Sequence, residues 1–318
     1  MVLHSEGNVD AMEYRVLARK YRPQNFKDLI GQDVLVRTLS NAFSQGRLAH
    51  AFILTGVRGV GKTTTARIIA KGINCIGADG KGGATIDPCG VCANCTGIME
   101  DRHVDVMEMD AASRTGVDDI REILDGVRYK PVAARNKVYI IDEVHMLSRN
   151  AFNALLKTLE EPPENVKFIF ATTEIRKVPV TVLSRCQRFD LKRLGMEDLA
   201  RLFATVCQKE NVTIERDALY ALGRAADGSA RDGLSLLDQS MALSVGEITS
   251  EVVQGMLGSS DRANILDLFE ETMSGDITTA LNHLEKMNQN GIDPLSIVQD
   301  LLEAVSYTHL TLPTNREV

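Results

Sequence analysis

The feature that most limits what this sequence can fold into is the stretch Gly56-Val57-Arg58-Gly59-Val60-Gly61-Lys62-Thr63, which matches the phosphate-binding pattern G-x4-G-K-S/T. Its glycines let backbone N–H groups curl around phosphate oxygens, and a following helix would direct its positive N-terminal end at the same anion. We expect Lys62 to reach the β- and γ-phosphates, Thr63 to bind Mg²⁺, and Thr64 to complete the nucleotide-binding run. The alternative is a glycine-rich turn followed by a chance Lys-Thr pair.

The segments around this loop predict an α/β domain. Apolar runs typical of buried strands occupy 50–56, 137–144 and 166–173, and residues 104–110 alternate in hydropathy as a strand does. Helical patterns accompany them at 33–45, 62–75, 116–129 and 148–161. Strands that alternate with helices predict a parallel sheet flanked by helices.

The strand signals fade after residue 190, where short helical patterns take over. These patterns cover 196–210, 215–226, 230–244, 249–256 and 261–306. We therefore expect an α/β domain over 12–190, a small helical domain over 191–257 and the start of a second helical domain over 258–305. We expect residues 1–11 to be a disordered extension. Residues 306–318 form an atypical tail, because their β-branched and turn residues interrupt the helical pattern.

Two carboxylates at the end of an apolar run supply the acidic partner that a phosphate-binding loop needs. The run 137–144 contains Asp142 and Glu143. Asp142 would hold Mg²⁺ through water, and Glu143 would act as general base or orient the attacking water. Adjacent carboxylates at a strand end therefore predict hydrolysis, with an exposed acidic loop as the alternative. We expect His145 to be structural.

Three further polar residues are candidates for reading the γ-phosphate. Thr173 follows the run "FIFAT" and could hydrogen-bond the phosphate or the water, or it could simply cap a turn. Arg185 in "LSRCQRF" is a candidate arginine finger for a neighbouring subunit's ATP. Arg231 in "GSARDGLS" begins a helix of the next domain and could reach back to the nucleotide. Either arginine alone could instead be an ordinary surface residue.

A cysteine cluster follows the predicted phosphate-binding helix. It consists of Cys75, Cys89, Cys92 and Cys95. Four thiolates with this spacing fit a closed tetrahedral Zn²⁺ site, which would stabilise an insert too rich in glycine to build its own core. The alternatives are a Cys-x2-Cys redox pair, an iron–sulfur cluster and simple buried thiols. We expect Cys186 and Cys207 to be ordinary buried thiols.

Charge and hydropathy narrow the choice of partners and location. The net charge of −7 does not by itself predict nucleic-acid binding, because DNA-binding proteins usually carry a basic face. Arg114 and Arg121 could line a DNA path or could belong to a solvated helix face. No apolar run approaches the length of a membrane span, and residues 1–11 do not read as a signal peptide, so we expect a cytoplasmic protein.

Taken together, these motifs closely resemble the gamma/tau subunits of bacterial DNA polymerase III, the clamp-loader ATPases within the AAA+ family. The resemblance covers roughly residues 12–305. It is carried by "YRVLARKYRPQNFKDLIGQ", "GVRGVGKTTTARIIAKGINC", "PCGVCANC", "DAASRTGVDDIREI", "IIDEVHMLSRNAFNALLKTLEEPPENVKF", "ATTEIRKVPVTVLSRC" and "AADGSARDGLSLLDQ". It implies an AAA+ parallel-sheet domain with an inserted zinc module, then a helical lid domain and a helical collar domain that is incomplete here.

The resemblance also implies a role for each candidate residue. The loop 56–63 matches Walker A, and Asp142 with Glu143 matches Walker B. Thr173 matches sensor 1, and Arg185, within Ser-Arg-Cys, matches the arginine finger that acts in trans. Arg231 matches sensor 2 on the lid. The cysteine cluster matches the family's structural zinc.

The function implied by the resemblance is ATP-driven opening and loading of a sliding clamp onto primed DNA. The expected cofactors are ATP, Mg²⁺ and structural Zn²⁺. The expected partners are delta, delta-prime and further gamma/tau subunits, the sliding clamp and primer–template DNA, with no membrane. The chain would be an ATP hydrolase within DNA polymerase III and has no polymerase active site itself. The rivals are a helicase or branch-migration motor, a non-catalytic scaffold like delta-prime, and a small-molecule P-loop kinase.

Overall fold

A computed structural model describes residues 15–113, 116–244, 246–257, 262–289, 292 and 294–311. The chain forms two compact units. The first contains the residues up to Lys209 together with Leu222–Asp238, and the second contains Glu210–Ala221 and the residues from Gln239 onwards. The three predicted domains divide the chain at other positions and stay a prediction. The predicted extension 1–11 lies outside the described residues.

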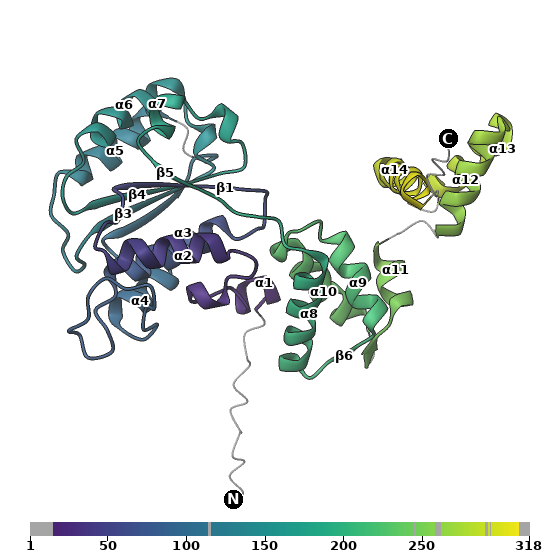
Figure 1. Cartoon of the computed structure of the whole chain (residues 1–318), viewed down its shortest axis with the longest axis horizontal. Helices are drawn as coiled ribbons and strands as arrows, with labels where there is room; N and C mark the ends of the chain where they lie inside the picture. The colour runs from purple at the N-terminus through teal and green to yellow at the C-terminus, as the bar shows by residue number, and fades with distance from the viewer. Residues whose placement is uncertain are drawn as a thin grey trace, which may run out of the picture. The chain divides into compact units, whose positions relative to one another are not determined.

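A parallel sheet of five strands is the centre of the first unit (Figure 1). The strands are β1 (Ala51–Thr55), β2 (Val106–Asp110), β3 (Lys137–Asp142), β4 (Val166–Thr172) and β5 (Gln187–Asp190). Their order is β2-β3-β4-β1-β5, and every neighbouring pair is parallel. This confirms the predicted parallel α/β architecture. The short strand β5 was not predicted.

Helices cover both faces of this sheet (Figure 1). One face carries α2 (Asp33–Ser44) and α3 (Lys62–Asn74), and the other carries α5 (Val117–Val127), α6 (Arg149–Glu160) and α7 (Val180–Leu183). All five residues of β1 are buried, as expected for the interior of a sheet covered on both sides. Phe52 and Leu54 join the core under α2 and α3, and Ala51 and Ile53 join the core on the opposite face.

The strand order decides which chain segments meet at the carboxyl edge of the sheet. Strand β4 lies between β1, which leads into the phosphate-binding loop, and β3, which ends at Asp142. Because parallel strands end at the same edge, the residues after β1, β3 and β4 come together there. Three of the predicted site segments are therefore neighbours in the fold.

The segments after β5 are almost entirely helical. They are α8 (Met196–Glu210), β6 (Thr213–Ile214), α9 (Arg216–Ala225), α10 (Ala230–Leu243), β7 (Glu247–Ile248) and α11 (Ser250–Leu257). Strands β6 and β7 pair with each other in parallel. This pair was not predicted, because two-residue strands leave no hydropathy pattern to detect.

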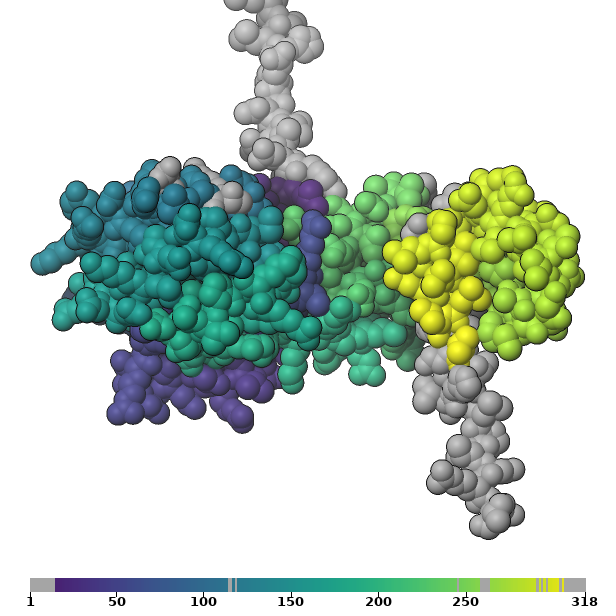
Figure 2. Space-filling model, turned by 90° about the horizontal axis from the view of Figure 1, so that it is seen from above, coloured from purple at the N-terminus to yellow at the C-terminus, as the bar shows by residue number. Residues whose placement is uncertain are grey.

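Three helices close the described part of the second unit. They are α12 (Arg262–Ser274), α13 (Ile277–Gln289) and α14 (Pro294–Thr311). Their shared core contains Ile265, Leu268, Ala280, Met287 and Ile297, and the space-filling view shows α14 (yellow) seated on the other two (Figure 2).

The end predicted for the last helix was wrong. The sequence analysis ended the helical pattern at residue 306, but α14 continues without a break to Thr311. Ser306, Thr308 and Thr311 cost little in a helix that is already formed, because each has only a weak local preference. The rest of the predicted tail, 312–318, lies outside the described residues. Within the described ranges, no helix combines the length and apolar character needed to cross a membrane.

Candidate functional site

The loop between β1 and α3 has the backbone shape that the sequence pattern predicts. Gly56, Gly59 and Gly61 have φ angles of 151°, 75° and 104°, in the region that side chains rarely adopt. A Cβ at Gly56 would lie 2.8 Å from the Leu191 carbonyl oxygen, and one at Gly59 would lie 1.9 Å from Ser229 Oγ. Any side chain at Gly56 or Gly59 would therefore force the loop to move.

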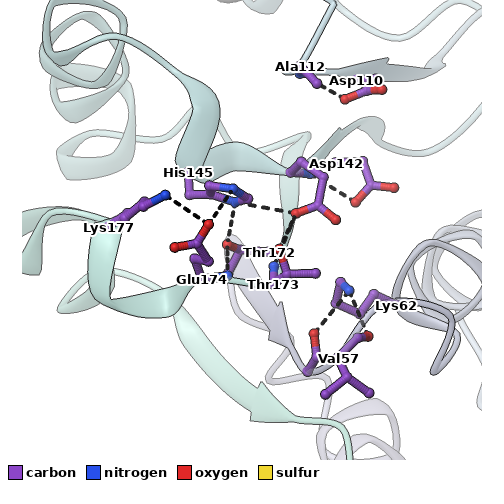
Figure 3. A network of polar contacts seen from close by, with 12 residues as sticks. Val57, Lys62, Asp110, Ala112, Asp142, His145, Thr172, Thr173, Glu174 and Lys177 are labelled. Carbon is purple, nitrogen blue, oxygen red and sulfur yellow. Dashed lines mark hydrogen bonds and ion pairs between the residues drawn. The ribbon is translucent and has the colours of Figure 1, made fainter. Parts of the chain in front are cut away.

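Lys62, the first residue of α3, folds over this loop (Figure 3). Its ammonium donates hydrogen bonds to the carbonyl oxygens of Gly56 (3.1 Å) and Val57 (3.0 Å), and the residue is 6% exposed. Burial lowers the pKa of Lys62, and the nearby charges of Glu143 and Asp142 act in the opposite direction. The Lys62 ammonium is therefore held between the carbonyl groups of the loop and the carboxylates at the end of β3.

The other residues of the loop differ in their exposure. Arg58 is exposed, Val60 is buried, and Thr63 and Thr64 are half-buried at the start of α3. Val60 packs into the core on the α3 side of the sheet, which anchors the loop from within.

Thr63 and Asp142 meet directly although 79 residues separate them in the sequence. The Thr63 hydroxyl donates to Asp142 Oδ2 at 2.6 Å, and the backbone N–H of Glu143 donates to Asp142 Oδ1 at 2.9 Å. Hydroxyl and carboxylate oxygens are the kind of ligands that Mg²⁺ takes in nucleotide sites. The two residues predicted to bind magnesium are thus side by side.

Glu143 and Thr173 also converge, from the ends of β3 and β4. Glu143 Oε2 accepts hydrogen bonds from the Thr173 N–H (3.1 Å) and from the Thr173 hydroxyl (2.9 Å). The backbone at Glu143 is left-handed, with φ 46° and ψ 44°. The predicted general base, Glu143, is therefore hydrogen-bonded to the predicted phosphate sensor, Thr173.

The sequence analysis missed part of this polar network. His145 is buried, with Nδ1 3.3 Å from Glu143 Oε2 and 3.0 Å from Thr172 Oγ1. Its Nε2 lies 3.5 Å from Glu174 Oε1. The signal that could have found these partners is the polar run Thr172-Thr173-Glu174, which directly ends a buried strand.

Arg231 and Arg185 have different surroundings. The Arg231 N–H donates to the Gly59 carbonyl at 3.3 Å, so the start of α10 touches the phosphate-binding loop within the first unit. The Arg185 guanidinium donates to Glu160 Oε1 (2.7 Å) and to the Thr181 carbonyl (2.7 Å), and a third of its side chain is exposed. The structure therefore places Arg231 beside the loop and Arg185 in a surface ion pair.

The four clustered cysteines form one compact group at the other end of α3. The sulfur atoms of Cys75, Cys89, Cys92 and Cys95 all lie within 4.8 Å of one another, and none is in a disulfide. Backbone N–H groups point at three of these sulfurs: Gly77 and Cys89 at Cys75, Cys92 at Cys89, and Cys95 at Cys92. Such donors favour thiolates, so the residues present fit a tetrahedral four-sulfur metal site.

The pKa values of the cysteine thiols differ even within the cluster, where burial raises the pKa of Cys95. Burial acts to raise the pKa of Cys89, but the N–H groups of Val91 and Cys92 outweigh it and lower the pKa to about 7. By contrast, burial raises the pKa of Cys186 to about 12 and that of Cys207 to about 11. Cys186 and Cys207 are therefore poor nucleophiles. This agrees with the prediction that both are ordinary buried thiols.

Polar contacts fasten the cysteine cluster to the sheet domain. Arg135 donates to the carbonyl oxygens of Ile73 (2.9 Å) and Cys75 (2.5 Å) at the end of α3. Helix α4 (Ala93–Met99) begins within the cluster, and Asn94 on it donates to the Asn74 carbonyl at 2.8 Å. The cluster is thus built onto the far end of α3 from the phosphate-binding loop.

The predicted DNA-path residues are only partly described. Arg121 is an exposed residue of α5, and Arg114 lies outside the described residues. A DNA path along these residues stays a prediction.

Comparison with protein families divides the chain into three consecutive matches. A model described as DNA polymerase III, delta subunit, matches residues 31–195. A model described as DNA polymerase III clamp loader subunit, ATPase lid domain, matches 199–246. A model described as DNA polymerase III subunits gamma and tau domain III matches 248–315, which includes most of the segment that the sequence analysis treated as an atypical tail.

Curated relatives are similar over most of this chain. The DNA polymerase III subunit tau of Escherichia coli is 47% identical over 291 residues, which cover 92% of this chain and 44% of that protein. Subunit tau/gamma of Haemophilus influenzae is 49% identical over 276 residues, covering 87% and 39%. Subunit gamma of Buchnera aphidicola subsp. Baizongia pistaciae is 41% identical over 292 residues, covering 92% and 78%. The chain thus spans less than half the length of the first two relatives.

Solved structures with the same fold include the Thermotoga maritima RuvB Holliday junction branch migration motor. Its TM-score is 0.56 at 19% sequence identity, over 79% of each chain. At that identity the similarity concerns the fold alone, whereas the identity to the gamma and tau subunits extends through all three matched regions. The chain belongs to the family of bacterial DNA polymerase III gamma/tau clamp-loader subunits.

Proposed function

We propose that this chain is an ATPase subunit of the bacterial replicative clamp loader, which uses ATP to open a sliding clamp and load it onto primed DNA. The observation that carries the ATPase part is the 2.6 Å contact between Thr63 and Asp142, beside a loop whose glycines have the positive φ angles that let its backbone curl around phosphates. The clamp-loading part rests on the family. A branch-migration motor shares only the fold, and we do not propose it.

Each residue of the loop has a task in holding ATP. The backbone N–H groups of 56–63 would bind the phosphates, and Lys62 would exchange its two carbonyl partners for phosphate oxygens. Thr63 and Asp142 would hold Mg²⁺, with Asp142 acting through water. The bound ion would neutralise charge on the β- and γ-phosphate oxygens.

Three residues then act on the attacking water and the γ-phosphate. Glu143 would take a proton from the water, and Thr173 would contact the γ-phosphate or the water. Arg231 would sense the nucleotide from the start of α10, a position supported by its backbone contact with Gly59. Arg185 would act on the ATP of a neighbouring subunit; its partly exposed guanidinium can exchange Glu160 for a phosphate.

The cysteine cluster is proposed to hold structural zinc. Four sulfurs within 4.8 Å of one another would fill all four positions of a tetrahedral metal and leave none for water, so the metal would stabilise the module and take no part in hydrolysis. A disulfide-forming redox pair is disfavoured by the convergence of all four sulfurs. An iron–sulfur cluster uses the same ligands and is distinguished by its absorption spectrum.

The partners follow from the family and are proposals for this chain. We propose assembly with delta, delta-prime and further gamma/tau subunits, and transient binding of the sliding clamp and primer–template DNA. A cytoplasmic location is proposed because the curated relatives are subunits of a DNA polymerase.

The ATP site is tested by Mg²⁺-dependent binding of a fluorescent ATP analogue to the purified chain. Lys62→Ala removes a charged hydrogen-bond donor, so we expect its affinity to fall about 10- to 100-fold. Asp142→Asn should weaken the dependence on Mg²⁺. Lys81→Ala, at an exposed lysine of the cysteine-containing insert, is the matched control and should bind as the wild type does. Equal affinity of the Lys62→Ala chain and the wild type would reject the proposed site.

A further inference from the structure

We infer that His145 is a positioning residue for Glu143. Together with Thr173 it holds the Glu143 carboxylate when the nucleotide is absent, and it keeps that hold when a phosphate draws the Thr173 hydroxyl away. The inference rests on the proposed function, in which Glu143 acts on water at an ATP site. It gives His145, which the sequence analysis treated as structural, a part in turnover.

One carboxylate oxygen of Glu143 is the centre of this arrangement, to which His145 and Thr173 both turn. Oε2 faces the Thr173 N–H at 3.1 Å, the Thr173 hydroxyl at 2.9 Å and His145 Nδ1 at 3.3 Å. An ionised carboxylate only accepts hydrogen bonds, so this contact requires a proton on Nδ1, which Glu143 Oε2 shares with the nearer Thr172 Oγ1 at 3.0 Å. The left-handed backbone of Glu143, unusual outside glycine, persists because these contacts fix it.

The ring of His145 is itself held on both sides. It lies in the short turn Val144–Met146, and its side chain is 6% exposed. On one side Nδ1 is 3.0 Å from Thr172 Oγ1, a hydroxyl that also accepts the Glu174 N–H at 3.0 Å. On the other side Nε2 faces Glu174 Oε1 at 3.5 Å, and this oxygen accepts from Lys177 at 2.8 Å. The ring therefore cannot swing away from Glu143 without breaking contacts at the end of β4.

The Thr173 hydroxyl has a single proton to donate. It gives that proton to Glu143 in this structure, and it can give it to a phosphate oxygen only by releasing Glu143. Within the described residues, the ring of His145 contacts Thr172, Glu143 and Glu174, and none of these partners belongs to the phosphate-binding loop. His145 is thus the side chain that still orients the carboxylate once the hydroxyl has moved.

Two amide substitutions test the roles of the two ring nitrogens of His145 separately. The amide nitrogen of asparagine is as many bonds from Cβ as Nδ1, and that of glutamine is as many bonds from Cβ as Nε2. H145N keeps a donor near Glu143, whereas H145Q moves the donor towards Glu174. We expect kcat of ATP hydrolysis to fall about tenfold or more in H145Q and to be largely rescued in H145N, with equal nucleotide affinity in both.

H283Q is the matched control, because it makes the same change in another histidine–carboxylate pair. His283 Nδ1 lies 3.2 Å from Glu271 Oε2, and both side chains are largely buried. Hydrolysis by H283Q should equal that of the wild type. Equal kcat in H145N and H145Q would overturn the inference, and so would a loss of affinity as large as the loss of kcat.

NMR of the histidine rings tests the inference without ATP hydrolysis. Nitrogen NMR of the histidine rings in the full chain should show that Mg²⁺ and a non-hydrolysable ATP analogue shift the His145 signals and leave those of His283 in place. Bound analogue with unshifted His145 signals would overturn the inference. A chain that binds the analogue, shifts the His145 signals and still hydrolyses no ATP with its partner subunits would contradict the proposed function alone. A chain that does not bind the analogue would reject both.

Discussion

At the scale of single residues, a largely buried ion pair joins helix α3 to the edge strand of the sheet. Arg67 on α3 is bidentate to Glu108 on β2, with Nε to Oε2 at 2.6 Å and Nη2 to Oε1 at 2.8 Å. The hydrogen bond and charge of Glu108 raise the pKa of Arg67 against the effect of burial. Pairs of this kind fix neighbouring elements, because removing one partner strands the other charge in the interior.

Asp105 gives a residue-scale prediction with a pH dependence. Its carboxylate accepts the N–H groups of Val132, Ala133 and Ala134 and is 2% exposed. Burial acts to raise the pKa of Asp105, but these three donors outweigh it and the pKa is lowered. We expect D105N to lose about 2 kcal/mol of unfolding free energy at neutral pH, measured by urea denaturation.

The sign of the pH effect follows from the lowered pKa of Asp105. Its stabilisation is complete above the unfolded value of about 3.9 and is lost as the pH falls through the folded value. The difference between wild type and D105N should therefore shrink below about pH 4. D79N changes an exposed aspartate of the insert, so its unfolding free energy should differ little from that of the wild type at every pH. A difference in unfolding free energy between wild type and D105N that stays constant down to acid pH would contradict this account.

Residue identities could be predicted where the chemistry demands a fixed type at a fixed spacing. Lys62, Thr63 and Asp142 were predicted from such a pattern, and the structure brings the last two into contact. The partners of His145 were not predicted: the polar run 172–174 marks the end of a strand, but it does not show that this strand lies beside β3. Only the pairing of the two strands in the fold brings His145 to Thr172.

At the scale of elements, α3 connects the two candidate sites. Its first residue follows the phosphate-binding loop, and the residue after its last turn is Cys75 of the cysteine cluster. Every residue from Thr65 to Asn74 is buried, so the helix is enclosed along most of its length. The cluster therefore stabilises the far end of the helix that carries Lys62 and Thr63.

Gly72 in α3 gives a prediction at this scale. A Cβ there would lie 2.7 Å from the Thr85 carbonyl oxygen and 2.8 Å from Phe43 Cζ, so the insert and α2 approach the helix too closely for any side chain. We expect G72A to destabilise the first unit by about 1–3 kcal/mol in urea denaturation, although alanine favours helices in general.

G255A is the matched control for this helix, since nothing lies within 4 Å of a Cβ at Gly255 in α11. The same change there should be neutral or stabilise by up to about 1 kcal/mol. An unchanged or increased stability of G72A would show that the insert does not pack against α3 as described.

The cysteine cluster gives a second element-scale prediction. We expect the purified chain to carry one zinc ion per molecule by elemental analysis, without the visible absorption of an iron–sulfur cluster. C92S should lose the metal and lower the melting temperature, because the insert has no other core. C207S, at a buried thiol outside the cluster, should keep the metal. Full zinc content in C92S would contradict the four-sulfur site.

Elements were predictable where a long hydropathy pattern existed. The four predicted strands and the helices around them are all present, with ends shifted by a few residues. Strand β5 escaped prediction because Gln187–Asp190 has only one buried residue among four, which is no pattern. Helix α4 was not predicted because its seven residues overlap the cysteine motif, which was interpreted as a metal site and not examined for helical spacing.

At the scale of the whole molecule, one edge of the sheet brings together predicted site residues from segments that are far apart in the sequence. The strand order puts β4 between β1 and β3, so Thr173 reaches Glu143 while Thr63 reaches Asp142. The start of α10 adds Arg231 to the same loop. By contrast Arg185, on the segment between α7 and β5, holds a surface ion pair, as a residue acting on a neighbouring subunit would.

The measurement that tests the central claim most directly is steady-state ATP hydrolysis by this chain mixed with delta and delta-prime subunits. It is made with and without sliding clamp and primed DNA, for the wild type, R185A and the control R188A, whose arginine pairs with Asp190 on β5. We predict stimulation that requires both clamp and primed DNA, a loss of about 10³-fold in R185A and none in R188A. Stimulation that is absent, or that is equal in R185A and the wild type, would contradict the account.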